Sequence, residues 1–187
     1  MTNTKYQTGL KRFVAAIIDG LVFLPLYFLE QWLYNENGNL PIVIGFVILL
    51  PFLPILYSIT LHYKFGQTIG KRVMDVKVLN VNEEKLLSLW QAIFRDSFYI
   101  VVQVIGLFYF SLFMFKEDNA LLINEYRNFA DQPLFWWTLL ELITMLTNSK
   151  RRALHDFIAK SVVVRSWNLQ PTLHCQNAGD RISFQLL

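Results

Sequence analysis

Four apolar stretches run along the chain, separated by short polar segments. They cover residues 13–34, 40–63, 97–115 and 133–147. A helix that crosses the hydrocarbon core of a bilayer needs about 20 predominantly apolar residues. The first three stretches reach such a length, whereas the fourth is shorter and contains Glu141. The pattern predicts an all-α membrane protein with four transmembrane helices.

Two of these stretches have features that predict irregular helices. The second contains Pro41, Pro51 and Pro54, and a proline inside a helix removes a backbone hydrogen bond and kinks the helix. We therefore expect the second helix to be bent, with neighbouring helices compensating for the lost bonds. The third stretch follows "LLSLWQAIFRD", whose apolar positions recur at helical spacing and predict a lead-in helix at the membrane interface.

Composition and charge fit a membrane protein. Of the 187 residues, 54% are hydrophobic and 17% are charged, whereas about 25% of the residues of a soluble domain are charged. Lysines and arginines near the ends of membrane helices collect on the cytoplasmic side. They are frequent before the first stretch, after the second and after the fourth, whereas the other connections hold only Lys116 and Arg127. This predicts two cytoplasmic termini in a plasma (bacterial inner) membrane, and it explains the net charge of +3 without nucleic-acid binding.

No group of residues is typical of an enzyme or a metal site, and we expect no catalytic residue, metal or cofactor. The only cysteine, Cys175, lies in the polar tail 166–187, which excludes a disulfide or thiolate framework. The histidines lack metal-ligand spacing, and for His155, beside Asp156, an interfacial hydrogen bond is favoured over a ligand pair. The first stretch is too long for a signal peptide and lacks a small-residue cleavage site, so we expect a retained helix.

The stretch "FGQTIGKR" is similar to a phosphate-binding loop, whose pattern is G-x-x-x-x-G-K-[ST]. Only three residues separate Gly66 from Gly70, however, and Arg72 stands where the hydroxyl residue should be. We therefore interpret it as a cytoplasmic turn after the second helix. Its glycines permit a tight backbone, and we expect Lys71 and Arg72 to contact anionic lipid headgroups.

The segment after this turn alternates apolar and polar residues. Val73, Val76, Val78 and Val81 lie among Asp75, Lys77 and Asn80, a pattern typical of extended backbone. We expect a short hairpin or an extended segment at the membrane surface, in the cytoplasmic loop between the second and third helices.

Ionisable residues at membrane depth are the candidate functional residues, because they are costly in hydrocarbon and face a bundle interior or a watery cavity. Arg12 and Asp19 are seven residues apart, which places them on nearly the same face of a helix. Ala16 and Gly20 form a small-residue pattern on this face, and such a pattern would let another helix come close.

Further charged residues lie at the same predicted level. Arg95 and Asp96 precede the third stretch, and Asp156 follows the fourth. We expect a buried pair between an arginine and a carboxylate of the first and third helices. The candidates for ion or proton binding are Asp19, Asp156, Asp96 and Glu141. Each has a structural alternative, since a paired structural carboxylate looks identical in sequence.

Four blocks of the sequence, in order, resemble the RDD family of small membrane proteins, named for one arginine and two aspartates. "KRFVAAIIDGLVF" is similar to the opening helix of that family, with Arg12 and Asp19 at its arginine and first aspartate. "FGQTIGKRVMDVKVLN" is similar to its signature loop, and "LSLWQAIFRDSF" to the start of the following helix, with Arg95. "KRRALHDFIAKSVVV" resembles its closing motif, with the second aspartate at Asp156. The chain departs from the family at "NVNEEK", where an aspartate-glycine turn is common, and at Ser161, where threonine is usual.

The resemblance implies one membrane domain over residues 1–165, and for a few members of the family it implies exchange of monovalent cations for protons. Our first hypothesis is a small, homo-oligomeric transporter. In it Asp19 carries the proton or cation, Arg12 and Arg95 are charge partners that tune it, and Asp156 closes the cytoplasmic mouth. Our second hypothesis is a non-transporting scaffold or accessory subunit in which these residues form a structural ion-pair network.

Overall fold

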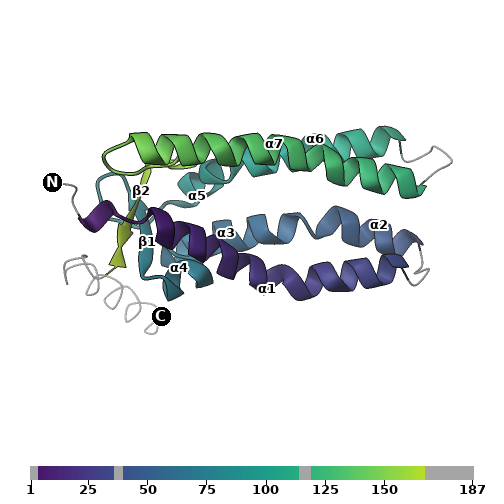
Figure 1. The fold of residues 1–187 in the computed structure, drawn as a ribbon, viewed down its shortest axis with the longest axis horizontal. Coiled ribbons are helices and arrows are strands. Elements are labelled where there is room, and N and C mark those ends of the chain that lie inside the picture. The colour runs from purple at the N-terminus through teal and green to yellow at the C-terminus, as the bar shows by residue number, and fades with distance from the viewer. Residues whose placement is uncertain (1–3, 36–39, 114–118, 167–187) are drawn as a thin grey trace, which may run out of the picture.

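The computed structural model describes residues 4–35, 40–113 and 119–166 (Figure 1). The predictions that concern Lys116, Cys175 and nearly all of the polar tail lie outside these residues. Most of the described chain is helical. In chain order the elements are η1 (Thr4–Tyr6), α1 (Gly9–Asn35), α2 (Leu40–Leu49), α3 (Phe52–Phe65), α4 (Ile69–Val73), β1 (Val76–Asn80), α5 (Leu89–Arg95), α6 (Ser97–Phe113), α7 (Asn119–Thr147), α8 (Leu154–Ile158) and β2 (Ser161–Arg165).

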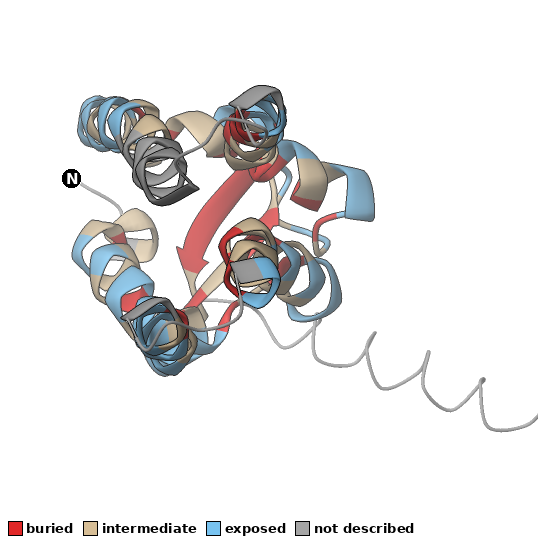
Figure 2. Cartoon of the chain, turned by 90° about the vertical axis from the view of Figure 1, so that its right-hand side faces the viewer, coloured by how far each residue is buried: buried red, intermediate tan, exposed pale blue. Residues whose placement is uncertain are grey.

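The long helices form two pairs that lie side by side, as Figures 1 and 2 both show. One pair is α6 and α7, and the other is α1 with the α2–α3 segment. The helices α3 and α6 connect the two pairs by direct contacts. The sheet and the short helices gather toward the end of the bundle where the described chain begins and ends.

Two segments are long and apolar enough to cross a membrane, Gly9–Leu33 and Pro41–Phe65. The helices α5 and α6 meet at an angle of 62° and form a third such segment if the bent pair is one span. The fourth predicted span, 133–147, lies within α7, which runs beside α6 (Figure 1). Among the described residues only these segments are long and apolar enough to cross a membrane, so the four-span count and the orientation stay predictions.

The outer surface of the long helices is apolar. Phe28 on α1 is 68% exposed, Phe108 on α6 is 66% exposed and Leu146 on α7 is 65% exposed. Such side chains would be unfavourable in water over so continuous a surface. The exposed apolar side chains therefore support a bundle that is surrounded by lipid.

The predicted irregularity of the second helix is confirmed: the helix is interrupted at Pro51. Leu50 and Pro51 separate α2 from α3, and the amide of Leu53 donates to the carbonyl of Leu50 at 3.2 Å. Pro41 and Pro54 lie in the first turns of α2 and α3, where a missing N–H breaks no helical hydrogen bond. Only the central proline therefore interrupts the segment.

The predicted lead-in helix before the third span is confirmed as α5. Its first turn is closed by a capping box, in which the Ser88 hydroxyl accepts from the Gln91 amide and the Gln91 side chain accepts from the Ser88 amide. Such reciprocal bonds satisfy two amides that the helix itself leaves unpaired. The chain then bends at Asp96 into α6.

Of the two alternatives predicted for the segment after the turn, the extended segment is confirmed as β1 and the local hairpin is wrong, while Val73 belongs to α4. The strand β1 pairs in antiparallel register with β2, from Val76 opposite Arg165 to Asn80 opposite Ser161. The strand is also not a surface segment, because Val78 and its partner Val163 are at most 1% exposed. The ribbon of β1 and β2 is buried on both faces, with Met74 and Leu87 against one face and Tyr6 and Leu86 against the other.

A turn centred on Glu83 follows β1, where the family commonly has an aspartate-glycine turn. Glu83 has φ 63°, a left-handed conformation that favours glycine. Its carboxylate accepts hydrogen bonds from Lys5 and Tyr6 and lies 3.4 Å from Nζ of Lys150. Burial alone would raise the pKa of Glu83, but the Lys5 and Tyr6 bonds lower it overall. The turn thereby ties the N-terminal segment to the segment after α7.

Candidate functional site

Asp156 on α8 is the centre of a buried ion-pair network at the sheet end of the bundle. Its Oδ2 atom accepts from Nη2 of Arg12 at 2.8 Å and from the Ala153 amide at 3.0 Å. Its Oδ1 atom lies 3.2 Å from Nη2 of Arg95 and accepts from the Ser161 hydroxyl at 3.2 Å. Burial alone would raise the pKa of Asp156, but Arg12 and Arg95 hold it well below its usual value.

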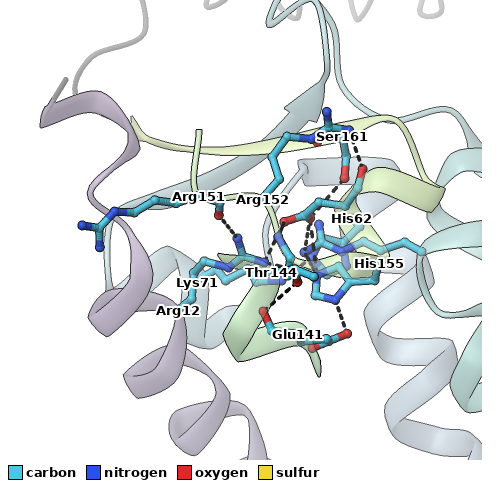
Figure 3. A network of polar contacts seen from close by, with 12 residues as sticks. Arg12, His62, Lys71, Glu141, Thr144, Arg151, Arg152, His155 and Ser161 are labelled. Carbon is cyan, nitrogen blue, oxygen red and sulfur yellow. Dashed lines mark hydrogen bonds and ion pairs between the residues drawn. The ribbon is translucent and has the colours of Figure 1, made fainter. Parts of the chain in front are cut away.

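His155 extends this network to α7 (Figure 3). Its Nε2 atom lies 3.2 Å from Nη2 of Arg12 and 2.9 Å from Nη2 of Arg95. A guanidinium group has only donors, so Nε2 accepts and Nδ1 carries the proton that it donates to Glu141. Oδ1 of Asp156 lies 3.3 Å from the same Nε2 atom. Both atoms are acceptors, and both lie close to Nη2 of Arg95. The predicted hydrogen-bonding role of His155 is therefore confirmed.

Asp19 is held by neutral donors. The expected arginine–carboxylate pair between the first and third helices does not form among the described residues, because Arg12 and Arg95 both pair with Asp156 on α8. The Asp19 carboxylate accepts from the Tyr57 hydroxyl at 2.8 Å, the Thr68 hydroxyl at 2.6 Å and the Gly70 amide at 2.8 Å. The side chain of Arg12 extends toward α8 and donates to Asp156. Asp19 thus attaches α1 to α3 and to the turn that precedes α4.

Gly70 is required where α4 presses against α1. A Cβ atom at Gly70 would lie 2.1 Å from the carbonyl oxygen of Ala15 and 3.0 Å from Cγ of Asp19. Gly66 ends α3 with φ 70°, so the expected tight glycine turn is confirmed. The expected close contact at Ala16 and Gly20 is wrong, because nothing lies within 4 Å of a Cβ atom built at Gly20.

A cavity of about 510 Å³ lies between the two helix pairs. Ala16 and Gly20 line it instead of packing against a helix. Its polar floor at the sheet end includes the side chains of Arg12, His62, Lys71, Arg95, Asp96, Glu141 and His155. Small-molecule sites have volumes of about 300–1,000 Å³, so the cavity is large enough for a solute.

Lys71 points into this cavity, which corrects the prediction that it contacts lipid headgroups. Nδ1 of His62 donates to the Ser58 carbonyl at 2.7 Å, so Nε2 accepts from Nζ of Lys71 at 2.7 Å. Burial lowers the pKa of Lys71 well below its usual value, and the charges of Arg95 and Arg12 lower it further. Arg72 is exposed, as a headgroup contact requires.

Asp96 and Arg95 have buried polar atoms with no partner among the described residues. These atoms are Oδ2 of Asp96, an acceptor, and Nη1 of Arg95, a donor. Asp96 is 9% exposed and Arg95 is 3% exposed, and both line the cavity. A buried polar atom without a partner is unfavourable, so these two atoms are where the cavity can bind a polar ligand.

The structure brings together most residues that the sequence singled out and adds others. Arg12, Arg95, Glu141 and Asp156 belong to one network, whereas Asp19 and Asp96 lie apart from its ion pairs. Sequence reasoning missed four partners, although each is a polar residue of the apolar second stretch or of the turn that follows it: Tyr57, Ser58, His62 and Thr68. Within the described chain, no three histidine, cysteine or acidic residues are grouped as a metal site.

The apolar bundle and its charged interior define an integral membrane protein. The sequence model of the RDD family matches residues 6–160, and the chain belongs to this family. The match confirms the resemblance drawn from the four sequence blocks. No curated protein and no solved structure matches the chain.

Proposed function

We propose that this protein exchanges a monovalent cation for protons across the membrane, and that Asp96 is the carboxylate that binds both. The observation that carries the proposal is the buried Oδ2 atom of Asp96, which has no hydrogen-bond partner among the described residues and belongs to a residue that lines the cavity. A buried carboxylate can hold a proton or a cation but not both at once. Competition at this group would couple the two fluxes.

The other carboxylates are less suited to exchange. Asp19 accepts three hydrogen bonds, and Asp156 contacts two guanidinium groups and two further donors. An incoming cation would have to displace these donors. Glu141 is hydrogen-bonded to His155. We therefore transfer the role expected for Asp19 to Asp96 and assign a structural role to Asp19.

Lys71 and His62 supply a second charge-sensitive group on the cavity floor. The ammonium group of Lys71 donates to neutral His62 and has no carboxylate within ion-pair distance among the described residues. A cation that enters the cavity would repel this ammonium group and favour its deprotonation. Release of the Lys71 proton would then accompany cation binding at Asp96.

Proton flux in proteoliposomes tests the proposal. Purified protein with a pH-sensitive dye inside the vesicles is exposed to pulses of Na⁺, K⁺ or Li⁺, with protein-free vesicles as the control. We expect at least one cation to drive proton movement, and we expect Asp96→Asn to abolish it. Absence of flux under every cation from a folded, wild-type sample would contradict the proposal.

A second candidate function is a non-transporting scaffold or accessory subunit. The saturated hydrogen bonding of Asp19 and Asp156 favours it, because both carboxylates join separate elements of the fold. In this case variants at these residues unfold, and no variant changes a flux. Wild-type cation-driven flux distinguishes the two candidates.

We propose that the sheet end of the bundle is cytoplasmic and that the protein lies in the plasma membrane as a homo-oligomer. The basic segments before α1, between α3 and α5, and after α7 all meet at this end (Figure 1). Their position agrees with the cytoplasmic preference of lysine and arginine, and exposed Arg72 suits anionic headgroups. Accessibility of single engineered cysteines in intact cells would test the orientation.

A further inference from the structure

We propose that the cavity binds a zwitterionic lipid, with a phosphoethanolamine headgroup on its polar floor and an acyl chain that leaves between α1 and α7. The inference goes beyond ion exchange. It rests on the position of the opening, on the polarity of the walls and on the two polar atoms without partners.

The opening of the cavity lies between α1 and α7. All the exposed residues that line the cavity belong to these two helices: Phe13, Ala16, Gly20 and Tyr27 on α1, and Thr138 and Leu142 on α7. The lining residues of α3, α4, α5 and α6 are all buried or half-buried. Because α1 is a candidate membrane span, the opening faces the region that lipid occupies.

The walls change from polar to apolar along the cavity. The lining of α1 extends from Gly9 to Tyr27, a distance of about 27 Å at 1.5 Å per residue. The helix α1 begins at the sheet end (Figure 1), and its lining residues run from Arg12 and Asp19 to Phe23 and Tyr27. The charged part of this wall therefore lies nearer the sheet end and the apolar part farther along. An amphiphile with a polar head and an apolar chain matches this change, and a small hydrophilic ion does not use the apolar part.

The chemistry of the floor calls for a ligand that both accepts and donates hydrogen bonds. Nη1 of Arg95 is a buried donor without a partner, and the ammonium group of Lys71 donates to a neutral imidazole. A phosphate accepts from both groups. Oδ2 of Asp96 is a buried acceptor without a partner, and a primary ammonium group can donate to it.

The negative charges at the floor exclude a purely anionic headgroup. Asp19 and Glu141 also line the cavity, but their carboxylates are bonded to Tyr57, Thr68 and His155 within the protein. Oδ2 of Asp96 would remain without a donor beside an anion. Phosphoethanolamine carries both required charges, phosphocholine has no N–H to donate, and phosphoglycerol has no positive charge.

Lipid binding can be separated from transport because it is measured at equilibrium, without vesicles or gradients. If Asp96 also exchanges ions, the lipid ammonium group competes with the cation for the same carboxylate. Failure of lipid binding therefore leaves ion exchange untouched, and absence of flux leaves lipid binding untouched.

Native mass spectrometry of the purified, delipidated protein tests the inference. Phosphatidylethanolamine, phosphatidylcholine and phosphatidylglycerol with identical acyl chains are titrated separately, together with free O-phosphoethanolamine as the headgroup alone. We expect phosphatidylethanolamine to bind about tenfold more tightly than the other two lipids, as one buried hydrogen bond predicts. We expect the free headgroup to bind at least as weakly as they do. Equal binding of the three lipids, or preference for the free headgroup, would overturn the proposal.

Three variants locate the site. Asp96→Asn removes the charge that attracts the ammonium group, so the preference for phosphatidylethanolamine over phosphatidylcholine should disappear. Lys71→Met should weaken all three phospholipids, whereas Arg72→Met, at the exposed neighbouring residue, should leave them unchanged. Gly20→Phe places a ring at the opening without touching the floor, because a Cβ atom there has nothing within 4 Å. Undiminished lipid binding in Gly20→Phe contradicts the proposed position even if the floor variants do not fold.

Discussion

Nη2 of Arg12 lies 2.8 Å from Oδ2 of Asp156, although 144 residues separate them in sequence. The two residues that the resemblance assigns to the arginine and second aspartate of the RDD pattern are therefore direct partners in this chain. The first aspartate, Asp19, has different partners on α3 and in the turn before α4. The three residues form two separate attachments of α1, one to α8 and one to α3 and the start of α4.

Removing the charge of Asp156 should destabilise the protein strongly. Asp156→Asn would leave Arg12 and Arg95 buried without their anionic partner, and breaking a buried ion pair costs about 3–5 kcal/mol. Asp75→Asn is the matched control, because Asp75 is exposed and its left-handed φ of 56° suits asparagine. Thermal unfolding in detergent measures both variants. Equal melting temperatures for the two variants would show that the network is dispensable.

The same network predicts how stability depends on pH. The pKa of Asp156 is lowered in the folded protein, so its stabilisation is present above the unfolded pKa of about 3.9 and is lost as pH falls through the folded value. We expect the melting temperature of the wild type to fall below about pH 4. Asp156→Asn should show a smaller decline over that range, and parallel curves for both proteins would refute the assignment.

Gly70 and Gly20 should respond oppositely to alanine. Gly70→Ala brings a Cβ atom to 2.1 Å from the Ala15 carbonyl oxygen, so α4 must move away from α1. Gly20 has open space around it on α1, where alanine is favoured over glycine by about 1 kcal/mol. We expect a lower melting temperature and faster hydrogen exchange at residue 70 in Gly70→Ala, and no loss in Gly20→Ala. A stable Gly70→Ala with unchanged exchange would argue against the close contact.

Cysteine cross-linking tests the distant strand pair. Val78 and Val163 are opposite each other in the register of β1 and β2, so cysteines at both positions should form a disulfide under mild oxidation. Cysteines at Val78 and Val162 should not, because neighbouring residues of a strand point to opposite faces. Both pairs are placed in a Cys175→Ser background. A disulfide from the second pair alone would indicate a register shifted by one residue.

Two opposing contributions to stability meet at Glu83: its side-chain bonds stabilise the turn, and its left-handed backbone conformation destabilises it. Glu83→Gln removes the negative charge that faces Lys5 and Lys150 and retains the left-handed φ. Glu83→Gly loses the same charge but relieves a backbone cost of about 1–2 kcal/mol. Chemical denaturation should therefore rank Glu83→Gly above Glu83→Gln in stability. The reverse order would mean that the backbone at residue 83 is not left-handed.

Local pattern predicted the parts of the fold that the bilayer imposes. The apolar stretches became the long helices, because every backbone group in lipid must be paired within a helix, and Pro51 interrupts the second one. The strand partner of Val78 could not be predicted, because alternation defines an extended segment and not the distant segment that pairs with it. The inward direction of Lys71 follows from Thr68, which caps α4 and bonds to Asp19. These are contacts between elements, and no periodicity in the sequence encodes them.

The most direct test of the proposed function compares two carboxylates in one assay. Proteoliposomes with wild type, Asp96→Asn or Asp19→Asn are given the cation pulse that drives the largest wild-type proton flux, after gel filtration has shown each sample to be folded. We predict that Asp96→Asn abolishes the flux and that folded Asp19→Asn protein retains it. Flux that survives in Asp96→Asn and disappears in Asp19→Asn would contradict the assignment of Asp96 and return the exchange site to the first aspartate.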